Sequence, residues 1–412
     1  MTDSTTNQQS TLKQLLQLPV LVAALGYLVD MYDLFLFNVV RVPSLRELGF
    51  EGEQLFEEGA KLLNIQMAGM LIGGIVWGVM GDKRGRLSVL FGSIIIYSLA
   101  NIANGFVNSV PQYAICRFIA GVGLAGELGA GVTLVAEILP KQIRGYGTTI
   151  VATLGLVGAI AAYFVAELFA WRVSYFVGGG MGLLLLILRI NIFESKIFVD
   201  AKNKHIERGN LLMLFNNRKR FVKYLMSILV GLPIWFVVGI LITFSPEFAK
   251  AAGILEPINA GKAVMLTFTG QVFGDVASGF LSQYLQSRKK VILLFILLSL
   301  SFILVYLLVP VSSPYSFYLI CAFLGFCNGY WTLFITIAAE LFGTNLRATV
   351  ATTVPNFVRG ATIPLLAVFK LLKPDMGIMY AALIIGVFTV AISLIALWNI
   401  EETFTKDMDY VE

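Results

Sequence analysis

The chain has 412 residues, of which 58% are hydrophobic and only 13% charged. Its mean hydropathy of +0.82 excludes a soluble globular protein of this size and indicates a protein that crosses a membrane many times. The formal net charge of +5 does not require a nucleic-acid partner, because basic loops at one membrane surface account for it.

Twelve apolar segments are long enough to cross a bilayer, since a spanning helix needs about 20 residues and satisfies its own backbone hydrogen bonds. The sequence therefore predicts an all-α membrane protein with twelve transmembrane helices. The expected spans are 18–40, 62–81, 87–107, 112–138, 148–170, 173–193, 222–247, 260–282, 291–310, 315–341, 348–369 and 376–399.

Lysine and arginine are distributed unevenly over the predicted loops. With the N-terminus inside, the inner segments carry 19 of these residues and the outer segments 8. The positive-inside rule then places both termini in the cytoplasm. The first 17 residues are polar and lead into a full-length span without a cleavage site, so no signal peptide is expected. We expect an integral protein of the plasma membrane, which in a bacterium is the inner membrane.

The first span contains two acids, Asp30 and Asp33, within the apolar run from Leu18 to Val40. A charge near the centre of a bilayer is costly, so such residues usually face a polar cavity and mark an ion or substrate pathway. Three positions apart, the two carboxyl groups lie on one face of the helix. Like charges at this spacing favour uptake of a proton, so the pair is a candidate proton site.

The loop between the second and third spans carries Gly78, Asp82 and Arg86. Glycine lets neighbouring helices approach closely, an aspartate can cap a helix N-terminus, and the basic residues hold the loop at the inner surface. We expect these three residues to belong to an inner gate and not to contact substrate.

Glu127 lies almost midway along the fourth span, among Gly123, Gly126 and Gly129. Glycines leave room for a ligand, and transporters built from repeats bind substrate near the midplane. Glu127 is therefore a candidate contact for substrate or a proton. The alternative is an inter-helix hydrogen bond made by a protonated carboxyl group.

An internal repeat relates two halves of the chain. Glu137 and Arg144 stand seven positions apart at the inner end of the fourth span, and Glu340 and Arg347 repeat this spacing 203 residues later. These four residues are expected to be gate or packing elements. The predicted organisation is an N-terminal six-helix bundle (1–193), a basic cytoplasmic linker (194–221) and a C-terminal six-helix bundle (222–412).

In the second half, Asp275 and Arg359 lie near the middle of the eighth and eleventh spans. They could neutralise each other, or Arg359 could receive a substrate carboxylate, because a guanidinium offers planar bidentate donors to an anion. Asp275 is then itself a candidate substrate contact. Aromatic walls with a few polar groups suit a small organic ligand. The other expected substrate contacts are Trp235, Gln271, Asn328, Tyr330, Trp331 and Asn356.

Several of these segments resemble motifs of the major facilitator superfamily. The loop Gly78-x-x-x-Asp82-Lys83-x-Gly85-Arg86 is similar to the family's signature loop, and Arg117-x-x-x-Gly121-x-Gly123 resembles its fourth-helix motif. The paired glutamate and arginine segments resemble its inner salt-bridge network. Within the family, the branch of metabolite:proton symporters, sugar porters and organic-ion transporters looks most similar, through Met31-Tyr32-Asp33, Arg117, Gly126-Glu127 and Phe193-Glu194-Ser195.

The resemblance implies a fold of two six-helix pseudo-repeats and a proton-coupling role for Asp33 and Arg117. The two residues lie at comparable levels, so an ionised Asp33 can be held by Arg117 and released when it is protonated. The alternative is a static ion pair that only fixes packing. Asp30 could share the proton, contact the substrate or line a wet cavity. Organic-anion members of the branch also use an arginine on the eleventh helix, where Arg359 lies.

Metal and enzyme chemistry find no support in the sequence. Cys116, Cys321 and Cys327 fall inside predicted spans without metal-ligand spacing, so we expect them to be packing residues, with no metal site. No nucleophile and base pair and no phosphate-binding glycine loop stands out, which argues against an enzyme, a cofactor and ATP as the energy source.

Together these features favour a secondary active transporter that works by alternating access. The predicted reaction is proton-coupled symport of a small organic anion or zwitterion, such as a carboxylate or an amino-acid-like metabolite. Its expected partners are the substrate, protons and the lipid bilayer, and a monomer is expected. One alternative is an antiporter of organic cations or drugs with protons, in which the acids Asp30, Asp33, Glu127 and Asp275 contact the cation. Another is a membrane sensor that no longer transports.

Overall fold

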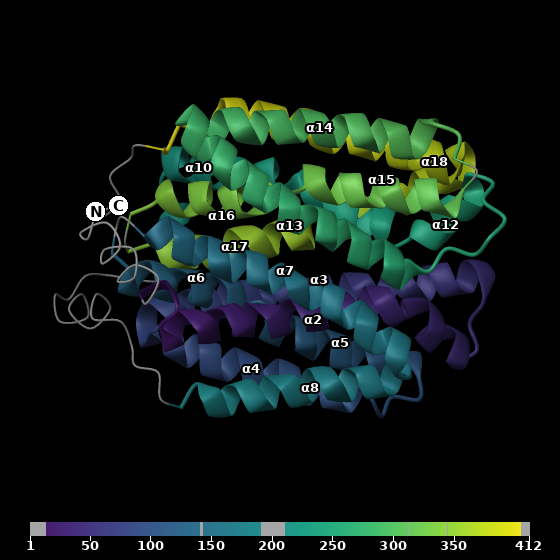
Figure 1. Ribbon diagram of the computed structural model, residues 1–412, viewed down its shortest axis with the longest axis horizontal. Coiled ribbons are helices and arrows are strands. Elements are labelled where there is room, and N and C mark those ends of the chain that lie inside the picture. Colours follow the sequence, from purple (N-terminus) through teal and green to yellow (C-terminus); the bar gives the residue numbers. More distant parts are fainter. Residues whose placement is uncertain (1–13, 141–142, 191–210, 312, 344, 405–412) are drawn as a thin grey trace, which may run out of the picture.

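The structure is a computed structural model, and the residues it describes are 14–140, 143–190, 211–311, 313–343 and 345–404. Within these ranges the regular structure is entirely helical (Figure 1), which confirms the predicted all-α fold. Most of the predicted linker 194–221 falls outside the described ranges, so the boundaries of the two bundles stay predictions. Figure 1 shows α2 to α8 mostly in the lower part of the molecule and α10 to α18 mostly in the upper part.

The helices are long and run nearly parallel to one axis (Figure 1). Those before the linker are α2 (Leu18–Glu47), α3 (Gly52–Arg84), α4 (Arg86–Asn104), α5 (Val110–Leu124), α6 (Glu127–Ile138), α7 (Arg144–Leu168) and α8 (Trp171–Leu188). Those after it are η1 (Leu211–Leu214), α10 (Arg218–Val230), α11 (Leu232–Phe236), η2 (Val237–Ile242), α12 (Ser245–Ala251), α13 (Ala260–Leu285), α14 (Arg288–Leu308), α15 (Pro314–Cys327), α16 (Trp331–Glu340), α17 (Arg347–Gly360) and α18 (Thr362–Trp398).

Eleven stretches of the described chain are long and apolar enough to cross a membrane. The last of them, Thr349–Trp398, has 50 residues and contains Gly377 in a non-helical conformation with φ 76° and ψ 166°. Fifty helical residues would extend about 75 Å, whereas the hydrocarbon core is about 30 Å thick, so this stretch makes two crossings joined at Gly377. With this stretch counted twice, the eleven stretches make twelve crossings, which is consistent with the twelve predicted spans.

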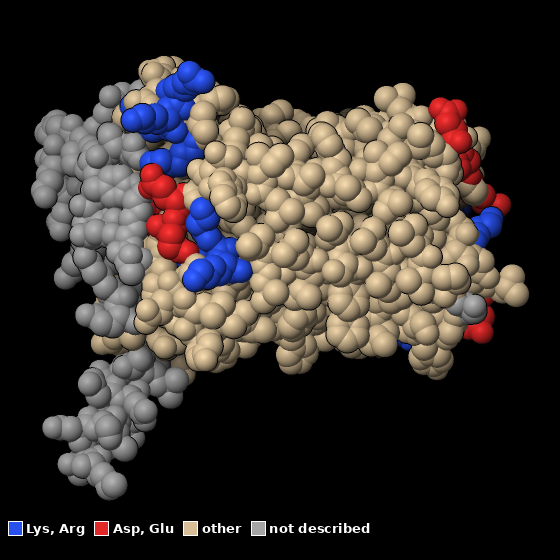
Figure 2. All heavy atoms as spheres, turned by 90° about the horizontal axis from the view of Figure 1, so that it is seen from above, with Lys and Arg blue, Asp and Glu red and all other residues tan. Residues whose placement is uncertain are grey.

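The two ends of the molecule are distinct. We call the end where α2 begins and α18 ends the terminal face, and the end where α2 finishes at Glu47 the far face (Figure 1). Figure 2 shows charged side chains gathered near both faces, with a broad uncharged belt between them. Large apolar side chains are exposed on the protein surface, among them Leu184, Phe280 and Ile395. Such a belt suits contact with lipid acyl chains.

The helix of the second crossing begins ten residues before the predicted span, since α3 starts at Gly52 and its first turns are acidic. These turns extend beyond the apolar belt, where they meet α18. Lys373 forms an ion pair with Glu53 at 2.5 Å, and Lys370 pairs with Glu57. Both pairs join the chain before the linker to the chain after it at the far face.

Two crossings are interrupted at equivalent positions. The fourth consists of α5 and α6, separated at Ala125 and Gly126, and the tenth consists of α15 and α16, separated at Asn328, Gly329 and Tyr330. The offset of 203 residues that relates the two glutamate and arginine segments also relates these two breaks. The internal repeat therefore extends from the terminal face to the middle of the bundle.

Glycines bring pairs of helix backbones into direct contact. A Cβ atom on Gly270 of α13 would lie 1.9 Å from the carbonyl oxygen of Ala322, and one on Gly325 of α15 would lie 1.8 Å from that of Thr267. The earlier helices pack in the same way, since a Cβ on Gly69 of α3 would lie 2.3 Å from the carbonyl oxygen of Phe118. Small residues of this kind allow close helix packing inside membranes.

We expect Gly270→Ala to destabilise the protein by about 1–3 kcal/mol, because the added methyl group meets backbone that cannot move aside. The midpoint of thermal unfolding in detergent should fall. Gly279→Ala on the same helix is the matched control, since nothing lies within 4 Å of its added Cβ. Equal midpoints for the two variants would contradict the close packing of α13 on α15.

Candidate functional site

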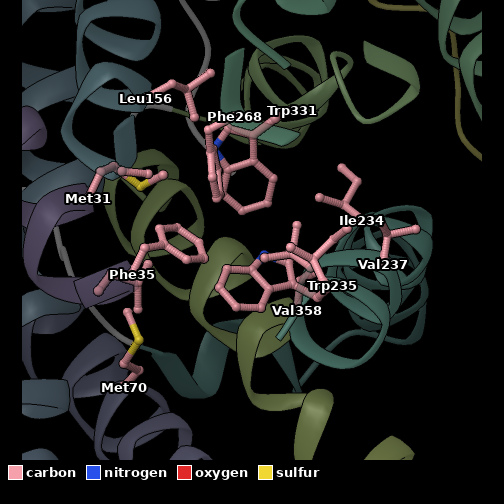
Figure 3. Close-up of a cluster of buried hydrophobic side chains, with 14 of the residues drawn as sticks. Met31, Phe35, Met70, Leu156, Ile234, Trp235, Val237, Phe268, Trp331 and Val358 are labelled. Atoms are coloured by element: carbon pink, nitrogen blue, oxygen red, sulfur yellow. The ribbon is translucent and has the colours of Figure 1, made fainter. Parts of the chain in front are cut away.

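Four aromatic side chains from different helices point toward one another near the middle of the bundle (Figure 3). They are Phe35 of α2, Trp235 of α11, Phe268 of α13 and Trp331 of α16. The ring centroids of Phe35 and Phe268 are 4.2 Å apart, and Phe35 stacks on Trp235 at 6.0 Å. Helices from both halves of the repeat thus contribute to one aromatic cluster.

The guanidinium of Arg359 on α17 belongs to this cluster. Its central carbon lies 5.7 Å from the ring centroid of Trp235 and 5.7 Å from that of Trp331, and the residue is only 1% exposed. Nη1 donates to the side-chain oxygen of Asn356 at 3.3 Å, and Nε has no hydrogen-bond partner. Among the described residues no carboxylate forms an ion pair with it. A buried positive charge is thus held by ring faces and one amide.

Asp275 does not neutralise Arg359, although the sequence left this pairing open. Its Oδ1 accepts a hydrogen bond from the backbone N–H of Thr332 at 3.1 Å, in the first turn of α16. The break in the tenth crossing frees N–H groups at the start of α16, and these attract a carboxylate. Asp275 therefore stabilises the helix break.

Asp30 and Asp33 on α2 are completely buried, and neither carboxylate has a hydrogen-bond partner among the described residues. Arg117 of α5 approaches Asp33 through the main chain, because Nη2 donates to the backbone oxygen of Asp33 at 3.3 Å. Arg117 is a cationic group that acts on the Asp33 carboxylate, and Asp30 lies beside that carboxylate. The charged groups around Asp30 include Arg359, Glu127 and Arg189. The two acids thus have different arginines among their charged neighbours.

The Asp33 carboxylate points toward α8. A Cβ atom on Gly178 would lie 2.2 Å from Asp33 Oδ1, so the glycine provides the space that the carboxylate fills. Arg117 itself lies 5.7 Å from the ring centroid of Phe37 and 5.6 Å from that of Tyr175. These ring contacts, with a hydrogen bond from Nη1 to Asn101 Oδ1 at 3.5 Å, hold the guanidinium beside Asp33, and no carboxylate of the described chain forms an ion pair with it.

Glu127 forms a bidentate ion pair with Arg189, which the sequence patterns did not single out. The distances are 2.7 Å from Nη1 to Oε1 and 2.8 Å from Nη2 to Oε2, and each side chain is 1% exposed. Arg189 also donates to the backbone oxygen of Leu90 at 2.6 Å, and the Ser93 hydroxyl donates to Glu127 at 3.3 Å. The signal was present in the sequence, since Arg189 is one of three arginines inside predicted spans.

The remaining predicted contacts join helices around the aromatic cluster. Trp331 Nε1 donates to the hydroxyl of Tyr27 at 3.2 Å, and Asn356 donates to the backbone oxygen of Ala125 at 2.9 Å, in the break of the fourth crossing. Further bonds run from Asn328 to the Ile234 oxygen at 3.5 Å and from the Tyr330 hydroxyl to the Val230 oxygen at 3.3 Å. Gln271 is buried, and its Oε1 has no partner among the described atoms.

The predicted gate residues of the first half cluster at the terminal face. Asp82 Oδ2 accepts hydrogen bonds from the backbone N–H of Thr349 at 3.0 Å and from its hydroxyl at 2.5 Å. Gly78 lies next to the same residue. Arg86 forms an ion pair with Glu137 at 2.8 Å and lies 3.6 Å from Asp82. Asp82 therefore caps α17 and connects it to α3.

In the second half the corresponding residues use different partners. Glu340 forms an ion pair with Arg288 at 2.7 Å, and Arg347 donates to the backbone oxygens of Ala339 at 3.3 Å and Phe342 at 3.4 Å. The side chain of Arg144 and the segment Phe193-Glu194-Ser195 lie outside the described part of the structure.

We expect Glu127→Gln to lower stability by about 3–5 kcal/mol, because it leaves the buried charge of Arg189 without a counterion. Thermal unfolding in detergent measures the change. Glu58→Gln is the control, because its ion pair with Lys61 is exposed and worth at most about 1 kcal/mol. An unchanged midpoint combined with lost substrate binding would instead support the predicted role of Glu127 as a substrate contact.

The fold and the central cluster of charges and aromatic rings define a membrane transporter built from related halves. A family model described as Major Facilitator Superfamily matches residues 23–360, and the chain belongs to this family. Membership places it among transporters rather than enzymes.

Proteins similar to this chain are named as transporters. It is 27% identical to a probable 4-methylmuconolactone transporter of Cupriavidus pinatubonensis, over 79% of this chain and 76% of the relative. It is 24% identical to the benzoate transport protein of Acinetobacter baylyi, over 80% and 78%. The proton:xylose symporter XylE from E. coli has a similar structure, with a TM-score of 0.72 and 16% identity, covering 94% of this chain and 96% of that one. This last likeness concerns the fold alone.

Proposed function

We propose that the protein is a proton-coupled symporter of a small organic acid. The observation that carries this proposal is the buried guanidinium of Arg359, which lies between two indole rings and forms no ion pair with a described carboxylate. A substrate carboxylate would supply the missing counterion through two parallel hydrogen bonds. A flat organic body attached to it would contact Trp235, Trp331 and Phe35. The similarity to a benzoate transport protein supports this substrate class.

The proposed coupling site is Asp33 with Arg117, and Asp30 beside it. An ionised carboxylate without a hydrogen bond is unfavourable in a membrane interior. Asp33 can be stable in two ways, by taking up a proton or by moving into direct contact with Arg117. Alternation between these two arrangements is the step that we assign to proton coupling. Arg359 is one of the charged groups around Asp30, so a substrate anion at Arg359 would alter the electrostatic environment of Asp30.

Transport would proceed by rocking of the bundles 1–193 and 222–412 about the central cluster, in a monomer. The terminal face would be cytoplasmic in the plasma membrane, and the bonds from Thr349 to Asp82 would hold that face shut. These bonds join the two bundles across the bundle interface, so they would break whenever the protein opens toward the cytoplasm.

A second candidate function is antiport of an organic cation or drug against protons. Asp30 and Asp33 favour it, because their carboxylates are buried and accept no hydrogen bond from the described part of the chain. The other two midplane acids are occupied, Glu127 by Arg189 and Asp275 by the N–H of Thr332. Comparing benzoate with benzylamine in a thermal-shift assay separates the two functions, because a ligand that binds the folded state raises its unfolding midpoint.

We expect Arg359→Lys to weaken benzoate binding by about 10- to 100-fold, because an ammonium cannot make the two parallel bonds of a guanidinium. Calorimetric titration of the purified protein measures the dissociation constant. The control is Arg172→Lys at the far face, which should leave the constant unchanged. Equal affinities of wild type and Arg359→Lys would contradict a carboxylate site at Arg359.

We expect Asp33→Asn to abolish benzoate accumulation driven by a proton gradient, because the amide cannot take up or release a proton. Exchange of labelled for unlabelled benzoate without a gradient should persist. Both are measured in proteoliposomes, with Asp375→Asn as a control in the connection at Gly377. Undiminished gradient-driven accumulation by Asp33→Asn would exclude it from coupling.

A further inference from the structure

A second buried arginine lies away from the central cluster, near the far face. Arg41 of α2 is completely buried, and its Nη2 binds both carboxylate oxygens of Glu247 on α12, at 2.7 and 2.9 Å. The same nitrogen donates to the backbone oxygen of Thr243 at 3.2 Å. The other two nitrogens, Nε and Nη1, have no hydrogen-bond partner in the described structure. The guanidinium therefore has N–H donors that no described group accepts.

The seventh crossing contacts Arg41 through residues that follow a π-helical turn. It contains the π-helical segment η2 (Val237–Ile242), whose wider turn is followed by Thr243 and the start of α12. The hydroxyl of Thr243 accepts a hydrogen bond from Asn38 at 2.6 Å, and the ring of Phe244 lies 4.7 Å from the Arg41 guanidinium. π-Helical turns occur frequently at functional sites. Together these contacts fasten α2 to the seventh crossing.

A large cavity lies directly beyond this contact. It has a volume of about 1540 Å³, opens at the far face, and is lined by residues that include Val40, Phe56, Trp171, Glu247 and Lys250. The carboxylate side chain of Glu247 is 23% exposed, whereas that of Arg41 is 0% exposed. The acid thus faces the cavity and covers the arginine behind it.

We propose that Arg41 is a transient binding site for the substrate carboxylate on its way from the far-face cavity to the centre. The proposal rests on the function inferred above, because it requires an anionic substrate. When Glu247 swings away, the buried charge of Arg41 is left without a counterion, and an incoming carboxylate can replace it. Once Glu247 has left, Nη2 is released and forms with Nη1 or with Nε a parallel pair of donors for the substrate carboxylate.

The position of Arg41 on α2 suits such a relay. Arg41 lies eight positions after Asp33, which corresponds to about 12 Å along the helix at 1.5 Å per residue. On the proposed route, an anion released from Arg41 would pass the level of Asp33 before it reaches Arg359. In this scheme the exchange of Glu247 for substrate also loosens the contact between α2 and α12, so binding of the anion promotes opening of the far face.

The rate of benzoate association tests this relay. In a Trp171→Phe background, which removes the indole that lines the far-face cavity, quenching of tryptophan fluorescence in a stopped-flow instrument reports arrival at the centre, where Trp235 and Trp331 lie beside Arg359. If the ion pair is only a latch, Arg41→Gln and Glu247→Gln break the same contact and both speed association. If Arg41 receives the anion, Glu247→Gln speeds association at least 3-fold, because a competitor is removed, while Arg41→Gln slows it at least 10-fold.

Further variants keep the outcome decisive. Arg41→Lys retains the charge but not the paired donors, so it should slow association at least 3-fold. This variant replaces Arg41→Gln in the test if Arg41→Gln does not fold. Lys370→Gln breaks the ion pair with Glu57 at the same face, away from the cavity lining, and should change the rate less than 2-fold. Rates that rise or stay unchanged in both Arg41 variants, with wild-type affinity, would overturn the relay alone. Absence of benzoate binding to the wild type would overturn the proposed function and the relay with it.

Discussion

The structure depends on how buried guanidinium groups are neutralised where water is excluded. Four of the largest fully buried side chains are arginines, Arg41, Arg117, Arg189 and Arg359. Leaving such a charge without partners is costly in a bilayer, so each arginine fixes the groups around it. Their partners differ in a graded way, from two carboxylate oxygens and a carbonyl for Arg189 to ring faces and one amide for Arg359. The more complete the pairing, the more permanent we expect the contact to be.

The completeness of pairing distinguishes arginines that hold the structure together from arginines that can change partners. The pair of Arg189 with Glu127 connects α6 to the end of α8 and holds the break of the fourth crossing. One of the three guanidinium nitrogens of Arg41 binds Glu247, which faces the far-face cavity. Arg117 and Arg359 lie beside aromatic rings and form no ion pair with any carboxylate that the structure describes, which would allow both to exchange partners during a transport cycle.

Much of the fold could be predicted from the sequence, because length and hydropathy determine which segments cross a bilayer, and the 203-residue repeat is visible in the chain itself. The cluster of Asp82, Arg86 and Glu137 also follows from its motif. The pairing of Glu127 with Arg189, and of Asp275 with the N–H of Thr332, could not be predicted. Both depend on how helices are rotated about their axes and on interruptions within single crossings. Neither property can be read from the hydropathy of a segment.

The glycine contacts between α13 and α15, and between α3 and α5, have a consequence for how the protein can diversify. Helices that touch through backbone atoms cannot accept larger side chains, so these surfaces are unavailable for change. The aromatic rings on α11 and α16 lie outside the glycine contacts. If these rings contact the substrate as we propose, new substrate preferences would arise by replacing Trp235 or Trp331 while the glycine contacts stay constant.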